Sequence, residues 1–218
     1  MSNRYSLRNI FICSIVLLPF IYLAYNYAAL PSIVPTHFGL EGKADGFSNK
    51  KTLWLFLSFL SALSIGVYFL IINRSKIDPK KTAKLSVSAF QKIAVGIVIF
   101  ISALNILIVY ASISGGIALN KLLLPATGLF FIYLGNLIHS IKPNYFVGIK
   151  TPWALEDPAN WRATHHLGGK MWVAGGILIT ISTLLLPQKA GGIIFSIIAS
   201  LLVVIPFAYS YLYFKKHK

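Results

Sequence analysis

Acidic residues are scarce in this sequence and are absent from its long apolar runs. Five Asp and Glu residues stand against 20 Lys and Arg residues. All five lie between the apolar runs, at Glu41, Asp45, Asp78, Glu156 and Asp157. Carriers coupled to protons or sodium ions usually place carboxylates within the membrane, where ionisable groups mark the ion pathway. The scarcity therefore argues against an ion-coupled transporter.

Cysteine and the common catalytic motifs are also lacking. The single cysteine, Cys13, excludes an intramolecular disulfide. Neither a His-Glu-x-x-His motif nor a nucleophile elbow occurs. The first apolar run has no small-x-small cleavage site and continues to spanning length, so we expect no cleavable signal peptide. These absences favour a protein that is not an enzyme and needs no cofactor.

Apolar residues, by contrast, are abundant. They make up 56% of the chain, only 11% of residues are charged, and the mean hydropathy is +0.73. A transmembrane helix needs roughly 20 mostly apolar residues. The sequence therefore predicts an all-α polytopic membrane protein with six transmembrane helices, at about 9–29, 53–73, 93–113, 122–140, 171–187 and 192–214.

The basic residues predict the orientation of these helices. Of the 20 Lys and Arg residues, 15 lie at the termini and in the second and fourth connections, and 5 lie in the other connections. Because Lys and Arg gather on the cytoplasmic side, both termini and the Lys142–Lys170 loop are predicted to be cytoplasmic. The net charge of +15 then reflects membrane orientation rather than direct binding of nucleic acid. We expect a multi-pass protein of the cell membrane, in contact with the lipid bilayer.

The connection at 30–52 is predicted to face outward. Its prolines and glycines disfavour a regular helix. His37, Glu41 and Asp45 recur every four residues, but a zinc site needs about four ligands and no second His or Cys lies nearby. A folded cap over the helices is therefore favoured over a metal site.

The basic connection at 74–92 is predicted to be cytoplasmic. Asp78-Pro79 has the pattern of a helix start, and the segment carries six basic residues against one acid. Attraction to anionic headgroups explains such a charge, and docking of a cytoplasmic protein is the alternative.

The connection at 141–170 is the long polar interval of the second half. Asp157-Pro158 predicts a helix start and Gly168-Gly169 a stop, so we expect a short helix lying along the membrane. On that helix Trp161 and His165 share one face, as do Arg162 and His166. Interfacial polar packing of the two histidines is favoured over catalysis.

Two motifs resemble known families. Leu30-Pro31, Val34-Pro35, His37-Phe38, Gly42, Asp45-Gly46 and Lys50 resemble the domain named DUF1648. Lys142-Pro143-Asn144-Tyr145-Phe146, Gly148 to Trp153, Trp161, Thr164-His165 and Gly168-Gly169-Lys170 resemble the signature of the SdpI family. Lys150 and His166 stand where that family commonly has Arg. Lys keeps the charge but loses bidentate geometry, so an anion clamp there would be weaker.

The resemblance implies three regions. They are a DUF1648-like two-helix unit at 1–73, the basic cytoplasmic loop at 74–92, and an SdpI-like four-helix unit at 93–218 with its signature loop at 141–170.

The resemblance also implies a function. SdpI-type proteins are membrane immunity proteins of Gram-positive bacteria that protect the cell from a secreted, membrane-active peptide toxin. They also act as signal transducers that hold a cytoplasmic winged-helix autorepressor at the membrane. We therefore expect toxin to meet the outward loop around His37 to Asp45 or the outer ends of the helices. We expect the repressor to meet the inward loops around Lys80 and around Lys150 to His166. The residues expected to form these binding surfaces are His37, Glu41, Asp45, Asn144, Gly148, Lys150, Thr151, Pro152, Trp153, Trp161, Thr164 and His165.

Two other classes remain as alternatives. A small-molecule membrane transporter or channel would fit the helices, although the acid-free spans speak against ion coupling. A metal-dependent membrane enzyme would require His37 or His165 to bind a metal. The glycines at 168, 169, 175 and 176 permit close helix packing, which makes the fifth span the candidate moving element.

Overall fold

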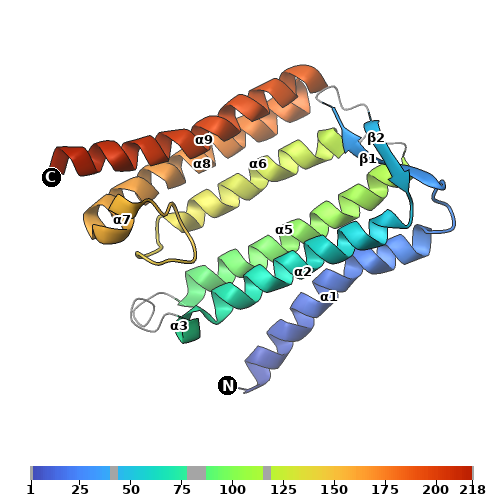
Figure 1. Ribbon diagram of the computed structural model, residues 1–218, viewed down its shortest axis with the longest axis horizontal. Helices are drawn as coiled ribbons and strands as arrows, with labels where there is room; N and C mark the ends of the chain where they lie inside the picture. Colours follow the sequence, from blue (N-terminus) through green and yellow to red (C-terminus); the bar gives the residue numbers. More distant parts are fainter. Residues whose placement is uncertain (1, 40–43, 78–86, 115–118, 218) are drawn as a thin grey trace. The chain divides into compact units, whose positions relative to one another are not determined.

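The computed structural model describes residues 2–39, 44–77, 87–114 and 119–217 (Figure 1). Within these ranges six helices are long and apolar enough to cross a membrane. They are α1 (Ser2–Asn26), α2 (Thr52–Ile72), α5 (Val87–Ile113), α6 (Leu119–Ile138), α8 (Pro158–Leu185) and α9 (Gln188–His217). The prediction of an all-α multi-pass membrane protein is confirmed. Two short helices, α3 (Arg74–Ile77) and α7 (Pro152–Glu156), lie in the connections.

The chain separates into two compact packing units. One unit comprises residues 1–68 and 94–123, and the other comprises residues 69–93 and 124–218. The DUF1648-like motif lies in the first unit and the SdpI-like motif in the second.

The first unit is built around a β-hairpin that packs on helices. Strands β1 (Ile33–Phe38) and β2 (Ala44–Asn49) pair antiparallel, with a register irregularity on either side of His37. Leu30 and Val34 enter a buried cluster with side chains from α1, α2 and α5, namely Leu23, Leu53, Leu57 and Val109. The expected folded cap therefore exists as a hairpin anchored by its apolar residues. Glu41 and Gly42 lie outside the described residues.

A buried polar contact joins two helices of the same unit. The side-chain amide of Asn105, on α5, donates to the hydroxyl of Ser61, on α2, over 3.2 Å. Both side chains are buried. Interhelical hydrogen bonds of this kind contribute about 1 kcal/mol in membrane proteins.

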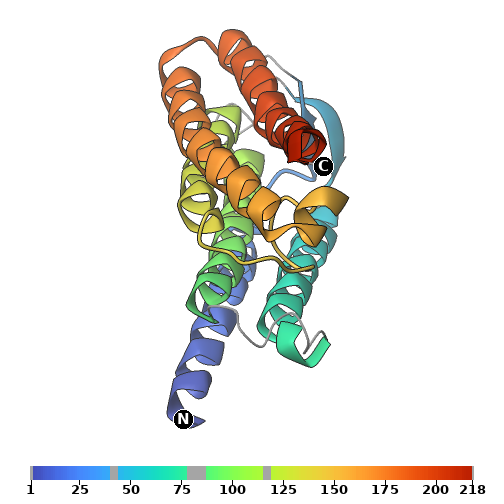
Figure 2. The same cartoon turned by 90° about the vertical axis from the view of Figure 1, so that its left-hand side faces the viewer.

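In the second unit, helices α8 and α9 lie side by side along much of their length, as both views show (Figure 1 and Figure 2). Helix α6 packs on α8 through facing glycines. A Cβ added to Gly135 would come within 2.8 Å of the carbonyl oxygen of Gly169, and one added to Gly176 within 2.5 Å of that of Gly128. Small residues permit this close approach of two backbones.

The predicted stop at Gly168-Gly169 is wrong. Helix α8 runs unbroken from Pro158 to Leu185, so the short helix and the fifth span are one element. The predicted start is confirmed, because the Asp157 carboxylate caps the helix by accepting from the backbone N–H groups of Ala159 and Asn160. Both glycines are buried, Gly168 against Ile149 of the loop and Gly169 against Gly135 of α6. Their role is to make room for neighbours, which outweighs their low helix propensity.

Candidate functional site

The turn that follows α6 is organised by one asparagine side chain. Asn144 is fully buried. Its amide oxygen accepts from the backbone N–H groups of Phe146 and Val147, each over 2.8 Å. Its amide nitrogen donates to the carbonyl oxygens of Lys142 and Val147, each over 2.9 Å. Because both donors and both acceptor positions are used, Asn144 fixes the path of the loop and is not available to a ligand.

Gly148 stands where the loop crosses the face of α8. It has a φ of +128°, a backbone conformation that side-chain-bearing residues rarely adopt. A Cβ at this position would lie 2.5 Å from Nε2 of His165 and 3.0 Å from the Trp161 ring. Both the backbone angle and the space therefore require glycine.

Trp161 and His165 form a stacked pair beneath this glycine. Their ring centroids are 3.9 Å apart, and both side chains are buried. The indole N–H of Trp161 donates to the carbonyl oxygen of Ile141 over 2.7 Å. The pair thus joins the start of the loop to the first turns of α8.

The hydrogen bonds of His165 define its tautomer. The backbone N–H of Ile149 donates to Nε2 over 2.9 Å, so Nε2 carries no proton. Nδ1 lies 2.8 Å from the carbonyl oxygen of Trp161 and must donate to it. The imidazole is therefore neutral and fully used, so the structure gives it a role in loop anchoring and leaves no ring nitrogen for a metal.

A second buried network ties the loop to α9. Thr151 caps α7, and its hydroxyl lies 2.6 Å from that of Ser210. The Ser210 hydroxyl donates to the amide oxygen of Asn160, so the Thr151 hydroxyl is the donor to Ser210. Asn160 in turn donates to the carbonyl oxygen of Ser210 over 2.9 Å, and Thr164 donates to Asn160 over 2.9 Å. We call Thr151, Asn160, Thr164 and Ser210 the polar node.

Comparison with known proteins follows the same division of the chain. Residues 140–210 match the SdpI/YfhL protein family, and residues 14–60 match a domain of unknown function, DUF1648. The immunity protein SdpI of Bacillus subtilis (strain 168) is 24% identical over 209 residues, which cover 96% of this chain and 97% of that protein. The resemblance to the SdpI family is confirmed. No solved structure matches the chain.

Within the SdpI-matched region, the predicted site residues divide into two sets. The buried set anchors the loop: Asn144, Thr151, Trp161, Thr164 and His165. Lys150 and Pro152 are exposed, and Lys150 donates to the carbonyl oxygen of Tyr145 over 3.2 Å. Trp153 is half-buried and lies against the rings of Tyr211 and Phe214, at 5.1 and 6.0 Å between centroids. Only the exposed set is available to a partner.

Two members of the SdpI-region network were missed by sequence reasoning. Asn160 and Ser210 are fully buried and hydrogen-bonded to each other, although 50 residues separate them. The spacing of four between Asn160 and Thr164 was the available signal, because it places two polar side chains on one helix face. Ser210 gave none, since a serine in an apolar helix commonly bonds its own backbone.

The DUF1648 motif also has a structural explanation. Nδ1 of His37 lies 2.5 Å from the Asp45 carboxylate across the hairpin, and both side chains are exposed. Lys50 donates to the carbonyl oxygens of Tyr27 and Leu30, over 2.9 and 3.1 Å, and lies 4.6 Å from the Tyr27 ring centroid. Lys50 thereby fixes the turn that follows α1.

No group of three or more His, Cys, Asp or Glu side chains with the arrangement of a metal site occurs among the described residues. Glu41, the third member of the predicted set with His37 and Asp45, lies outside them. The described part of the chain offers His37 and Asp45 as a polar pair open to a ligand.

Proposed function

We propose that this chain is a membrane immunity protein that protects its cell from a secreted, membrane-active peptide toxin. The observation that carries the proposal is the likeness to immunity protein SdpI along nearly the whole of both chains. The six apolar helices place the protein where such a toxin acts. The likeness is to a protein named for immunity, which favours a binding role over catalysis.

We place the toxin contact at the hairpin of the first unit. A groove of about 450 Å³ lies between the hairpin and α2. Aromatic and aliphatic side chains line it, of which Phe47, Leu55 and Phe59 are more than 60% exposed. Because Leu55 and Phe59 belong to a candidate membrane span, the groove offers apolar contacts to a peptide in the bilayer. Thr36, Ser48 and Thr52 supply polar groups in its lining, and the exposed pair His37 and Asp45 lies on the same hairpin.

We place the contact with a cytoplasmic repressor on the exposed face of the signature loop. Lys150, Arg162 and His166 are exposed there. The buried Asn144, Trp161 and His165 hold the loop in place beneath them. A preorganised loop with projecting cations suits an acidic surface on a protein partner.

Expression in a toxin-sensitive bacterial host tests the protection. Cells that make the wild-type chain should survive a dose of membrane-active peptide toxin that kills cells carrying the empty vector. Phe47→Ser with Phe59→Ser should reduce survival, because these substitutions remove apolar contact in the groove. The matched control is Phe207→Ser, an exposed aromatic of α9 outside that groove. Wild-type cells that die like vector cells would refute the proposal.

A second experiment separates sensing from protection. Lys150→Gln with Arg162→Gln should leave survival unchanged and abolish membrane recruitment of a winged-helix repressor tagged with a fluorescent protein. Lys216→Gln with Lys215→Gln removes the same charge from the end of α9 and serves as the control. If both double variants retain recruitment, the signature loop is not the repressor surface.

A further inference from the structure

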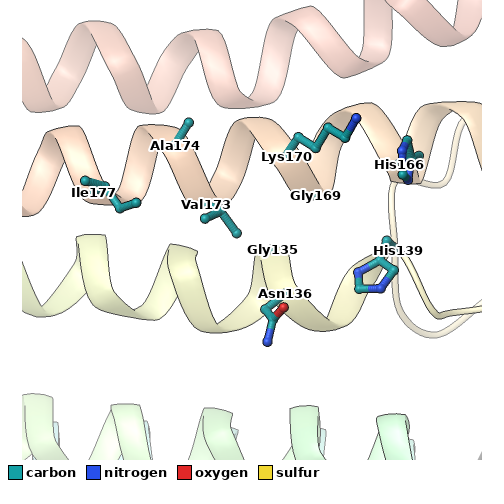
Figure 3. A pocket seen from close by; sticks show the side chains of 9 residues that line it. All are labelled: Gly135, Asn136, His139, His166, Gly169, Lys170, Val173, Ala174 and Ile177. Carbon is teal, nitrogen blue, oxygen red and sulfur yellow. The ribbon is translucent and has the colours of Figure 1, made fainter.

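A groove between α6 and α8 shares only His166 with the surfaces of the proposed function. It encloses about 440 Å³. Helix α6 and the turn after it contribute Gly135, Asn136 and His139, and α8 contributes His166, Gly169, Lys170, Val173, Ala174 and Ile177. Figure 3 shows these side chains along the two helices.

The two ends of the groove differ in chemistry. His139 and His166 lie together at one end, and the Lys170 side chain runs along α8 toward that end (Figure 3). Val173 and Ile177 lie toward the other end, about one and two turns after Lys170 on α8. From His166 to Ile177 the helix rises roughly 16 Å at 1.5 Å per residue. The groove is therefore polar at its head and apolar along its length.

The polar end is suited to an anion. Among the residues that the structure describes, no acidic side chain lines the groove, and Lys170 is exposed. Arg162 lies one turn before His166 on α8, and both line an adjoining hollow that also lacks acids. Each imidazole donates at least one N–H whatever its charge. Lys and Arg with N–H donors are the groups that bind phosphate oxygens.

The apolar end identifies the source of that anion. The backbones of α6 and α8 approach closely at Gly135 and Gly169, which leaves a shallow trough flanked by Val173, Ala174 and Ile177. A soluble phosphate would leave this trough uncovered, whereas an acyl chain would fill it. Basic pockets between transmembrane helices are known to take anionic lipid headgroups.

We infer that this groove binds one anionic phospholipid, with its phosphate at His139, His166 and Lys170 and an acyl chain along Val173, Ala174 and Ile177. The inference stands apart from toxin immunity, since it concerns the second unit alone and is tested on the purified protein.

Native mass spectrometry of the detergent-solubilised full chain tests this site. The protein is titrated with dioleoyl phosphatidylglycerol or with dioleoyl phosphatidylcholine, which share their acyl chains. Both lipids carry a phosphate, but only phosphatidylcholine also carries a quaternary ammonium group, which would be repelled by the Lys170 ammonium. The first phosphatidylglycerol should therefore bind about tenfold more tightly. Lys170→Gln should remove most of this preference, and Lys170→Arg should retain it. Lys216→Gln, the same charge change at the exposed end of α9, should leave it intact.

A second variant tests the acyl-chain part of the groove. Ala174→Phe should weaken binding of the first phosphatidylglycerol at least as much as Lys170→Gln does, because the phenyl ring would occupy the trough. Circular dichroism and size-exclusion chromatography confirm that each variant keeps its helices and remains monodisperse before binding is compared.

Three outcomes would overturn the inference. Equal retention of the two lipids would show that the groove has no preference for an anionic phospholipid. If Lys170→Gln and Lys216→Gln lost the preference for phosphatidylglycerol equally, the preference would come from general charge attraction and not from this groove. Displacement of a fluorescent phosphatidylglycerol by inorganic phosphate, with no effect of Ala174→Phe, would make the groove a site for soluble anions.

Discussion

The hairpin at 33–49 and the signature loop at 141–170, which includes the start of α8, are both motif-bearing connections, but they use their polar residues in opposite ways. In the hairpin, the His37 and Asp45 side chains are 74% and 53% exposed. In the loop and the start of α8, Asn144, Thr164 and His165 are 0% exposed. An exposed ion pair contributes little to stability, whereas a buried polar group is costly to leave without a partner. The loop motif therefore encodes a scaffold, and the hairpin motif leaves its polar pair open to a ligand.

The largest expected effect is at the glycine of the loop. Gly148→Ala should destabilise the protein by about 4 kcal/mol, because the backbone angle becomes strained and the new methyl group meets the His165 ring. Thermal unfolding in detergent, followed by intrinsic fluorescence, measures the loss. Gly66→Ala is the matched control, since a Cβ there meets no other atom within 4 Å. Equal melting temperatures for the two variants would contradict the structure of the loop.

Asn144→Ala should cost about 3 kcal/mol, because two backbone N–H groups and two carbonyl groups lose their partner. Limited proteolysis should show faster cleavage between residues 142 and 150. Asn26→Ala is the comparison, since that side chain makes a single bond to its own helix. A loop that resists protease in Asn144→Ala would mean that other contacts hold it.

The polar node should show coupling between α8 and α9. Asn160→Ala and Ser210→Ala should each destabilise the protein, and the double variant should be less destabilised than the sum by about 0.6–1.7 kcal/mol. A double-mutant cycle on thermal unfolding measures this energy. Pairing Asn160→Ala with Ser200→Ala provides the reference, because the Ser200 hydroxyl bonds within α9. If the destabilisations of Asn160→Ala and Ser210→Ala simply added in the double variant, the polar node would not couple α8 to α9.

Lys50→Gln should lower stability by about 1–2 kcal/mol, through lost bonds to the carbonyls of Tyr27 and Leu30 and a lost contact with the Tyr27 ring. Hydrogen exchange should speed up at the end of α1 and leave α9 unchanged. Lys51→Gln, at the next position and exposed, is the control. If hydrogen exchange near the end of α1 were equally fast in Lys50→Gln and Lys51→Gln, Lys50 would not stabilise this region.

The smallest expected effect is at the exposed pair. His37→Ala and Asp45→Ala should each change the free energy of unfolding by less than about 1 kcal/mol. The same variants should reduce protection against the toxin if the hairpin is the binding surface. A large loss of stability in either variant would show that the polar pair of the hairpin supports the fold, as the buried polar residues of the signature loop do.

The transmembrane helices were predictable because length and apolarity are properties of the sequence itself. The predicted second span, 53–73, differs from α2 by one residue at each end. The fifth span was predicted at 171–187 because Gly168-Gly169 resembled a helix stop. Those glycines instead lie against Ile149 and Gly135, and such contacts are not visible in local sequence.

The sequence motifs singled out residues of the loop but not the contacts that these residues make. The motifs pointed to Asn144, Gly148 and His165, yet their spacing could not show that Asn144 closes a turn or that His165 accepts from Ile149. Ser210 was missed because its partners lie 50 and 59 residues away. Long-range partners are set by packing, which a local pattern does not encode.

The two glycine contacts between α6 and α8 limit how these helices can move. Gly128 faces Gly176, and Gly135 faces Gly169, so the contacts are two turns apart on both antiparallel helices. A shift by one turn would bring side chains such as Ile132 and Val173 against the opposing backbone where only hydrogen atoms fit. A piston stroke of α8 along α6 would therefore meet steric resistance at both glycine pairs.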